Sequence, residues 1–108
     1  MRGCIYKSIL AVRFEWHALK SELNLTRRGF DFEFATLVFD GKVVEWEDQR
    51  ADYGEQRVVA VGMADGWLLT VVYTDRFVAG GVSRRIISAR RSSRRERERY
   101  EETYQTSA

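Results

Sequence analysis

The stretch QRVVAVGMADGWLLTVVYT, residues 56–74, carries the clearest structural signal in this 108-residue sequence. Two runs rich in valine and aromatic residues, 56–63 and 67–74, flank the dipeptide Asp65-Gly66. Asp-Gly between such runs is the strongest short-range signal for a β-hairpin, because both turn positions adopt a positive φ. The sequence therefore predicts two antiparallel strands. The second is apolar on both faces and is expected near the centre of a sheet.

Further strands are predicted on both sides of this hairpin. Residues 12–16 alternate apolar and charged side chains, the period of a half-buried strand, and 42–47 and 82–89 are rich in β-branched residues. The intervening segment 75–81 ends in two glycines and is expected to be a flexible connection.

Two helices are predicted between the first strand and residue 41. One face of the predicted first helix is formed by Trp16, Leu19, Leu23 and Arg27, which follow one another at intervals of three, four and four residues. Gly29 supplies the left-handed residue that ends it, and Asp31 can cap the start of a short second helix. Near the C-terminus, Ser93 and Glu96 have the spacing of a capping box, so a last helix begins there.

The last helix has only Tyr100 and Tyr104 as sizeable apolar groups, so it is expected to dock through its aromatics, through partners, or through both. Residues 103–108 are expected to fray. Helices followed by antiparallel strands predict an α+β fold, and the chain length predicts a single domain over residues 1–108.

Charge is unevenly distributed along the chain. Residues 84–99 hold eight arginines and two glutamates, whereas the whole chain has a net charge of only +2, so the remainder is acidic. A basic pole favours a polyanion or an acidic partner, although a solvated, salt-bridged helix remains an alternative. Strand alternation predicts that Arg84, Ile86, Ser88 and Arg90 face one way and that Arg85, Ile87, Ala89 and Arg91 face the other. One set would line a concave surface beside Tyr100 and the other would pair with the acidic body, and spacing does not decide which.

Several chemistries are excluded by composition. No apolar run is long enough to span a membrane, no signal peptide is evident, and Cys4 is the only cysteine, so a reducing cytoplasm is expected. His17 is the only histidine, which excludes a histidine-pair ribonuclease. Phosphate-loop and clustered-aspartate motifs are absent, so neither a metal nor another cofactor is expected. RNA supplies its own 2′-hydroxyl nucleophile, which arginine, tyrosine and glutamate side chains can assist.

The sequence resembles the BrnT toxins over about residues 12–102. The motifs that carry the resemblance are Trp16-x-x-x-Lys20, Asn24-x-x-Arg27-Arg28-Gly29, Asp48-x-Arg50-x-Asp52-Tyr53-Gly54-Glu55-x-Arg57, Gly62-x-x-Asp65-Gly66, Arg85-Ile86-Ile87-Ser88-Ala89-Arg90-Arg91 and Glu96-Arg97-x-x-Tyr100-Glu101. The resemblance implies a RelE-like fold and a bacterial ribonuclease toxin that arrests growth. It also implies a ribbon-helix-helix antitoxin, BrnA, that blocks the toxin. His17 and Arg27-Arg28 depart from the family pattern, and residues 1–11 resemble an N-terminal extension.

The leading hypothesis is therefore a metal-independent endoribonuclease that inhibits translation. The expected catalytic residues are Glu55, Arg57, Arg85, Arg90 and Tyr100. The expected RNA-binding residues are Lys20, Arg27, Arg76, Arg91 and Arg97. Either Glu55 or Tyr100 would move protons, but Glu55 could instead pair with Arg57 or Arg50, and Tyr100 could simply pack the last helix.

Two other functions stay open at this point. The basic end could belong to a non-catalytic module that binds RNA, DNA or an acidic antitoxin segment. A DNA-binding regulator is a third hypothesis, although no dimeric reader element is evident. The chain could also form a homodimer within a toxin–antitoxin complex.

Overall fold

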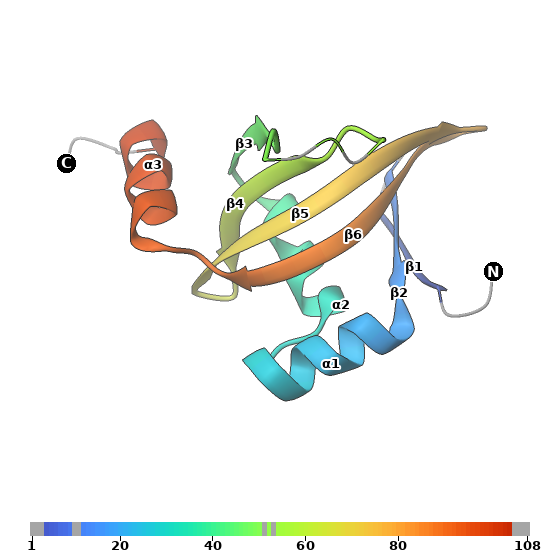
Figure 1. Ribbon diagram of the computed structural model, residues 1–108, viewed down its shortest axis with the longest axis horizontal. Coiled ribbons are helices and arrows are strands. Elements are labelled where there is room, and N and C mark those ends of the chain that lie inside the picture. Colours follow the sequence, from blue (N-terminus) through green and yellow to red (C-terminus); the bar gives the residue numbers. More distant parts are fainter. Residues whose placement is uncertain (1–3, 10–11, 51, 53, 105–108) are drawn as a thin grey trace.

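A six-stranded sheet with helices around it forms the computed structural model (Figure 1), which describes residues 4–9, 12–50, 52 and 54–104. The strands, in the spatial order β1-β2-β6-β5-β4-β3, are β1 (Cys4–Ile9), β2 (Val12–His17), β3 (Val43–Glu47), β4 (Val58–Ala64), β5 (Trp67–Val78) and β6 (Gly81–Arg91). The helices are α1 (Ala18–Arg28), α2 (Phe32–Ala35), the 3-10 segment η1 (Thr36–Asp40) and α3 (Arg94–Tyr104). The predicted α+β class is confirmed. No helix among the described residues is long and apolar enough to cross a membrane.

The β4–β5 hairpin forms as the sequence predicts. Asp65 and Gly66 both have positive φ, at 49° and 86°, and Ala64 pairs with Trp67 across the turn. Every residue from 68 to 74 is buried, because β5 lies between β4 and β6 and is covered on both faces. The central position of this strand is therefore confirmed.

The prediction of a wholly antiparallel sheet is wrong at one pair. β2 runs parallel to β6, with Val12 opposite Val82 and Trp16 opposite Ile86. A parallel pair needs a long crossover, and here the connection includes α1, α2 and the strands β3 to β5. β2 and β6, which are far apart in the sequence, are therefore neighbours in space.

The segment 75–81 is not the flexible connection that its glycines indicated. β5 continues to Val78, β6 begins at Gly81, and the turn between them contains only Ala79 and Gly80, whose φ is 88°. Phe77 pairs with Val82 in this extension. The two strands form a long hairpin arm that projects beyond the rest of the sheet (Figure 1).

The face predicted for α1 is also wrong. Leu19 and Leu23 are 56% and 39% exposed, whereas the buried residues of α1 are Ser21 and Asn24. The Ser21 hydroxyl accepts a hydrogen bond from the backbone N–H of Phe32, and the Asn24 amide donates to the carbonyl of Phe30. Because the helix is held to the following turn by polar contacts, its leucines are left outside.

The helix boundaries themselves follow local sequence signals. The His17 side chain accepts from the N–H of Lys20 at the start of α1, and Gly29, with a φ of 88°, ends this helix. The Asp31 carboxylate accepts from the N–H of Phe34 and so caps α2. Thr103 is still helical in α3, and residues 105–108, for which fraying was predicted, lie outside the described part of the chain.

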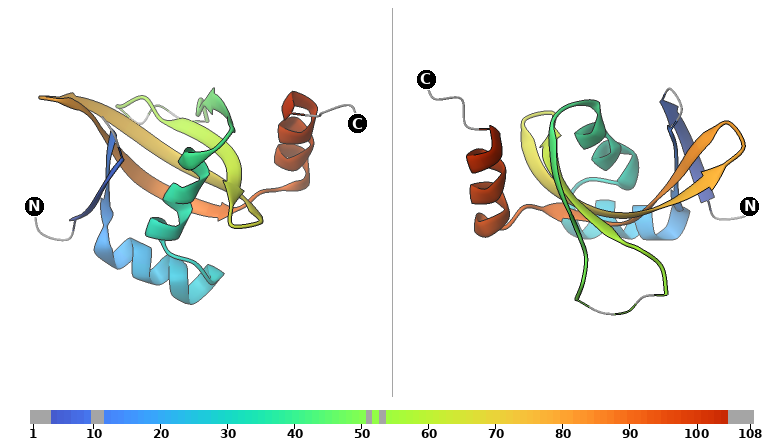
Figure 2. Two further views of the ribbon diagram at one scale, coloured as in Figure 1. Left: turned by 180° about the vertical axis from the view of Figure 1, so that it is seen from behind. Right: turned by 90° about the horizontal axis from the view of Figure 1, so that it is seen from above.

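The apolar core lies between the sheet and the segment formed by α2 and η1 (Figure 2, left). Its buried members are Phe14, Trp16, Phe30, Phe32, Ala35, Val38, Ala60, Ala64, Leu69, Val71, Tyr73, Ile86 and Ala89. We call the opposite face of the sheet the distal face. The segment that links β3 to β4 lies on that side (Figure 2, right).

A β-bulge in β6 changes which arginines share a face. Val72 pairs with Ser88 and Tyr73 with Ile86, so Ile87 is an extra residue, and Ile86 and Ala89 both enter the core. The simple alternation predicted for residues 84–91 is therefore wrong beyond the bulge. The residues on the core side are Arg84, Ile86, Ala89 and Arg91, and those on the distal face include Arg85, Ser88 and Arg90.

Residues 4–9 form β1, an edge strand paired antiparallel with β2. Their assignment to an N-terminal extension stays a prediction, and residues 1–3 and 10–11 lie outside the described part of the chain.

Candidate functional site

A buried carboxylate lies at the base of the distal face. Glu15 of β2 is only 2% exposed, because its neighbours Phe14 and Trp16 point into the core and turn it to the opposite side. The Ser83 hydroxyl donates to Glu15 Oε2 over 2.9 Å, and Arg76 Nη2 lies 3.2 Å from Oε1. Glu15 is not among the residues that the sequence predicts for the site, although the alternation in 12–16 indicates that it faces away from the aromatics.

A second carboxylate, Glu55, is held between two arginines. Its Oε2 accepts from Arg57 Nε over 3.1 Å, and both of its oxygens lie 3.3 Å from Arg85 Nη2. The segment that carries Glu55 is fixed to β5 by the Thr74 hydroxyl, which donates to the carbonyl of Gln56 over 2.8 Å. The Glu55 side chain is 31% exposed, so it is reachable from solvent.

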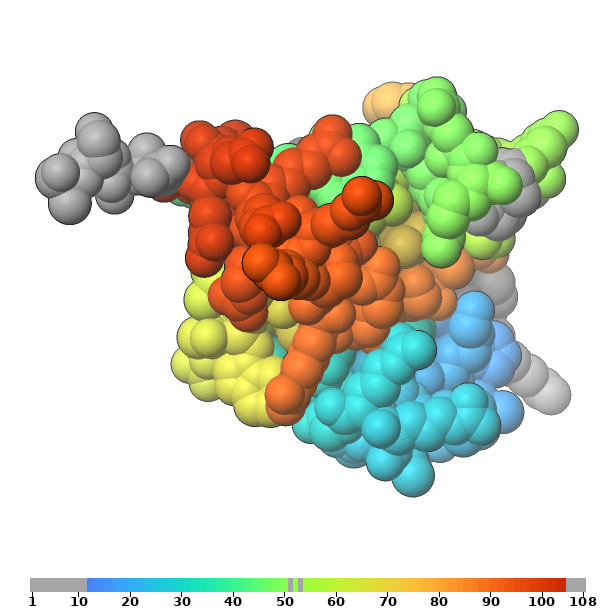
Figure 3. Space-filling model, turned by 60° about the vertical axis from the view of Figure 1, so that its left-hand side comes forward, coloured from blue at the N-terminus to red at the C-terminus, as the bar shows by residue number. Residues whose placement is uncertain are grey.

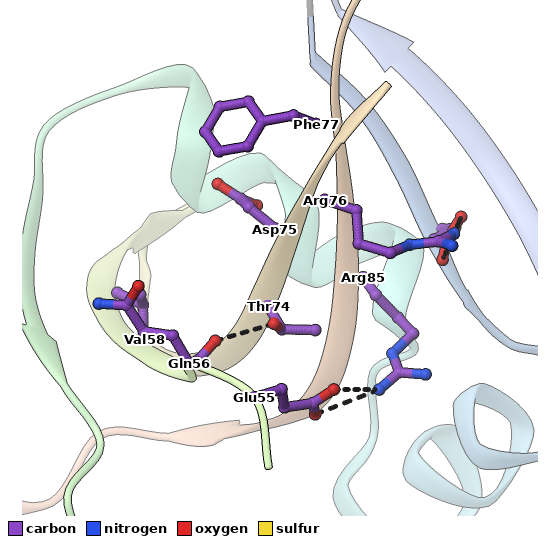
Figure 4. A pocket seen from close by; sticks show the side chains of 9 residues that line it. Glu55, Gln56, Val58, Thr74, Asp75, Arg76, Phe77 and Arg85 are labelled. Carbon is purple, nitrogen blue, oxygen red and sulfur yellow. Dashed lines mark hydrogen bonds and ion pairs between the residues drawn. The ribbon is translucent and has the colours of Figure 1, made fainter. Parts of the chain in front are cut away.

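These groups line one open cavity of about 630 Å³ (Figure 4). Its lining residues are Glu15, Glu55, Gln56, Val58, Thr74, Asp75, Arg76, Phe77 and Arg85. The carboxylate of Glu55 and the guanidinium groups of Arg76 and Arg85 lie on one side of β5, whereas the Asp75 and Phe77 side chains point to its other side (Figure 4). A cavity of this kind can bind an anion through arginine and accept a proton on a carboxylate.

A separate cluster lies at the junction of β6 and α3. Arg90 makes two hydrogen bonds of 2.7 Å to the two oxygens of Glu96, which also accepts from the Thr70 hydroxyl and from the N–H of Ser93. The N–H of Glu96 donates to Ser93 Oγ in return, so the predicted capping box is confirmed. Burial acts to raise the pKa of Glu96, but the hydrogen bonds from Arg90, Ser93 and Thr70 outweigh it and lower the pKa to about 2. The hydrogen bond to Glu96 in turn raises the pKa of Arg90.

Arg84 belongs to the core side and is mainly enclosed by aromatic rings. Its guanidinium lies 4.1 Å from the ring centre of Tyr73 and 4.9 Å from that of Phe39, and its Nε and Nη2 bind the Asp75 carboxylate. Burial and a hydrogen bond from its hydroxyl to Glu45 raise the pKa of Tyr73. This cluster stabilises the root of the hairpin arm rather than the cavity.

The structure brings together only part of the predicted site. The cavity is lined by Glu55, Arg76 and Arg85, and Arg57 contacts Glu55. Arg90 belongs instead to the cluster with Glu96. The other predicted residues lie elsewhere. Tyr100 is in tilted contact with the Tyr104 ring, and Arg91 lies over the Trp67 ring. Lys20 and Arg27 line a smaller cavity beside α1, and Arg97 is exposed on α3.

The α3 helix docks through aromatic and cationic contacts, as its composition predicts. Arg99 lies 4.2 Å from the ring centre of Trp46, Lys42 lies 5.5 Å from that of Tyr104, and the Tyr104 hydroxyl donates to the carbonyl of Val43. Figure 3 shows α3, in red, beside the green segment around β3. The C-terminal part of β6, in orange, lies between these two segments and α1, which is cyan.

No three histidine, cysteine, aspartate or glutamate side chains are grouped to hold a metal ion within the described part of the chain.

A family model described as the ribonuclease toxin, BrnT, of type II toxin-antitoxin system matches residues 16–96. No curated protein matches the chain. The matched range includes the residues of the cavity from β4, β5 and β6 and stops before Arg97 and Tyr100.

Proposed function

The chain belongs to the BrnT family of ribonuclease toxins of type II toxin–antitoxin systems, and we propose that it cleaves RNA in the distal-face cavity. The observation that carries this proposal is the Glu55 carboxylate held between Arg57 and Arg85 on the open wall of that cavity. RNA cleavage needs a group to take the proton of the 2′-hydroxyl and cations to stabilise the phosphorane. Both kinds of group meet here.

In the proposed reaction, Glu55 accepts the proton of the 2′-hydroxyl. The 2′-oxygen then forms a bond to the adjacent phosphorus and the bond from phosphorus to the 5′-oxygen breaks. The leaving oxygen takes a proton from a water molecule in the open cavity, and the hydroxide that remains takes the proton from Glu55, which restores the carboxylate. The products are a 2′,3′-cyclic phosphate and a 5′-hydroxyl.

Arg85 and Arg57 supply the positive charge for this step. A guanidinium has five N–H donors in a rigid fork, so one arginine can contact a carboxylate and a phosphate oxygen together. Arg76 is proposed to bind a neighbouring phosphate, with Glu15 fixing its position through their contact at 3.2 Å. Glu15 is thus a positioning residue and not a group that touches the reacting atoms.

The cavity geometry does not support a role in catalysis or RNA binding for six other predicted residues, and these roles stay proposals. The six residues are Lys20, Arg27, Arg90, Arg91, Arg97 and Tyr100. For Arg90 the two-point pair with Glu96 favours a role in anchoring α3. For Tyr100 the 5.1 Å contact with the Tyr104 ring favours packing. Glu55 is therefore the preferred proton acceptor.

We further propose that cleavage is metal-independent, that the fold is RelE-like, and that a BrnA-like ribbon-helix-helix antitoxin is the partner. Glutamate and arginine suffice for the proposed step without a metal. Family membership supports an antitoxin partner of some kind. An acidic antitoxin segment would suit the arginines at the cavity wall.

The test is cleavage of a labelled RNA by purified protein in EDTA, with the 2′,3′-cyclic phosphate end identified by mass spectrometry. Glu55→Gln is expected to reduce kcat by about 100-fold or more, the usual contribution of a general base. Arg94→Ala is the matched control, because Arg94 is an exposed α3 arginine paired only with Glu98 in i,i+4 register. Full activity of Glu55→Gln, or no cleavage by the wild type, would overturn the proposal. Binding of RNA without cleavage would instead identify a non-catalytic binding module.

A further inference from the structure

The outer edge of β5 has no partner strand along the hairpin arm. β4 pairs with β5 only from Trp67 to Tyr73, whereas β6 pairs with it as far as Val78. Among the residues that the structure describes, no strand and no backbone–backbone hydrogen bond reaches residues 75–78 from the side of β4. We call this part of β5 the open edge. Such an edge presents a row of N–H and C=O groups that can pair with another strand.

The distal-face cavity follows the open edge. Its wall includes four consecutive residues of β5, from Thr74 to Phe77. Successive side chains of a strand point to opposite sides, as Figure 4 shows for Arg76 on one side and for Asp75 and Phe77 on the other. Four such residues share only the backbone edge between the two faces, so the cavity surrounds that edge. Val58, where β4 begins, also lines it, and the cavity therefore lies where a longer β4 would continue.

The two sides of the open edge differ in chemistry. On the side of β5 that carries Tyr73, the Phe77 side chain is 90% exposed, so its apolar area is not removed from water. On the other side, the Arg76 and Arg85 side chains are 59% and 46% exposed. Their carboxylate partners are less exposed, at 2% and 31%. A strand along this edge would therefore meet an apolar ring on one side and cations on the other.

We propose that an extended segment of a protein partner pairs with the open edge as an added strand and fills the distal-face cavity. The apolar side chains of this segment cover Phe77, and its acidic side chains, which alternate with them, contact Arg76 and Arg85. In β-strand addition, main-chain hydrogen bonds give affinity and alternate side chains give specificity. The inference rests on the proposed function for its consequence, because a strand here would cover Glu55 and exclude RNA. Family membership supports an antitoxin as the source of the segment.

The chemistry of the open edge favours a protein segment over RNA or a second copy of this chain. The RNA backbone has phosphate acceptors but no N–H donors, so it cannot match the donors and acceptors that alternate along a strand edge. Two copies paired edge to edge would bring both Arg76 side chains to one face of a joint sheet, and like charges on neighbouring strands destabilise pairing. An acidic and apolar strand avoids both costs.

The probe is the tightest binder selected on the purified protein from a phage-displayed library of random linear peptides, and then synthesised. Its sequence is expected to alternate apolar and acidic residues. N-methylation of one backbone nitrogen at a time is expected to weaken binding about tenfold at every second position and to have less than about a twofold effect between them. The reason is that only alternate N–H groups of a strand point to its neighbour.

Two further measurements place the peptide on the protein. Amides of residues 75–78 are expected to gain protection from hydrogen–deuterium exchange when the peptide binds. Phe77→Ala is expected to weaken binding about tenfold, because burial of a large apolar side chain is lost. Leu19→Ala is the matched control, since Leu19 is an exposed apolar residue of α1, and its effect is expected to stay within about twofold.

Failure to select a binder, protection of other segments only, or an N-methyl scan without alternation would overturn the proposal. A dimer of the free protein that Phe77→Ala abolishes would instead assign the open edge to a second copy. Protection of 75–78 by a 2′-O-methyl oligonucleotide, with none from the peptide, would assign it to RNA. If the peptide binds as an added strand but the protein never cleaves RNA, the docking site stands and the proposed catalysis fails.

Discussion

Arg90 and Glu96 form a two-point ion pair that joins the end of β6 to the first turn of α3, with both nitrogen–oxygen distances at 2.7 Å. Glu96 also satisfies the Ser93 N–H and the Thr70 hydroxyl. One carboxylate therefore connects the last helix, the last strand and the central strand.

Replacement of Glu96 by glutamine is expected to destabilise the fold by about 1–2 kcal/mol at pH 7, the usual cost of losing a hydrogen-bonded charge pair. The folded-state pKa of about 2 lies below the usual 4.5, so the carboxylate stabilises the fold above pH 4.5. This contribution is lost as the pH falls towards 2. Urea unfolding of the wild type and Glu96→Gln across this pH range is expected to show a difference in the free energy of unfolding that shrinks as the pH falls. A difference that does not change with pH would contradict it.

The neighbours Arg84 and Arg85 are expected to have opposite phenotypes, because they lie on opposite faces of β6. Arg84→Ala removes a guanidinium stacked on Tyr73 and Phe39, so it is expected to lower the free energy of unfolding by about 1–2 kcal/mol. Arg85→Ala is expected to keep the stability and to lose most of the cleavage. Each variant serves as the control for the other in thermal unfolding and RNA cleavage. Identical behaviour of the two would contradict the assigned faces.

Glu15→Gln is expected to raise the KM for RNA several-fold with a smaller change in kcat, because it releases Arg76 without touching the reacting atoms. Glutamine can still accept the hydrogen bond from Ser83, so the fold is kept. In an Arg76→Ala background the same substitution is expected to have no further effect on KM. Additive effects of the two replacements would show that Glu15 does not act through Arg76.

Tyr100→Phe is expected to leave kcat within about twofold, because Glu55 is the proposed proton acceptor and a ring alone can maintain the contact with Tyr104. The measurement is single-turnover cleavage over pH 5–9, alongside Glu55→Gln. A large fall in kcat for Tyr100→Phe, with normal thermal stability, would transfer the proton-transfer role to Tyr100.

Gly62→Ala is expected to cost about 1–3 kcal/mol of stability through overpacking. A Cβ at Gly62 would lie 3.0 Å from Val43 Cγ1 and 3.1 Å from Val38 Cβ, where β4 passes closely under η1 and β3. Gly41→Ala is the matched control, because nothing lies within 4 Å of its added Cβ and its φ of −129° suits any residue. Chemical denaturation of both variants tests the difference, and equal stabilities would contradict it.

Sequence reasoning succeeded where the signal is local. The turn at Asp65-Gly66, the end of α1 at Gly29 and the caps at Asp31 and Ser93 each depend on a few adjacent residues. Such motifs satisfy their own backbone groups, so they form in the same way in many folds.

The errors concern contacts between distant parts of the chain. The parallel pairing of β2 with β6 is invisible to any local pattern, and the bulge at Ile87 is a property of the paired strands rather than of one strand. The polar inner side of α1 depends on backbone groups of Phe30 and Phe32 that the helical period does not include.

The candidate site was predictable only in part for the same reason. The sequence predicts roles for Glu55, Arg57, Arg76 and Arg85, which the structure brings close together, but the spacing gives no indication that Arg90 belongs to a different cluster. Glu15 lies more than sixty positions from Ser83 and Arg76 in the chain, so its burial becomes evident only when β2 is paired with β6.

The position of β6 beside β2 has a consequence for protein synthesis. β2 is synthesised before β6, its parallel partner, and the strands β3 to β5 are made between them. Glu15 therefore cannot meet Ser83, and Glu55 cannot meet Arg85, until β6 has left the ribosome. A nascent chain that stalls before this strand therefore lacks the assembled cavity.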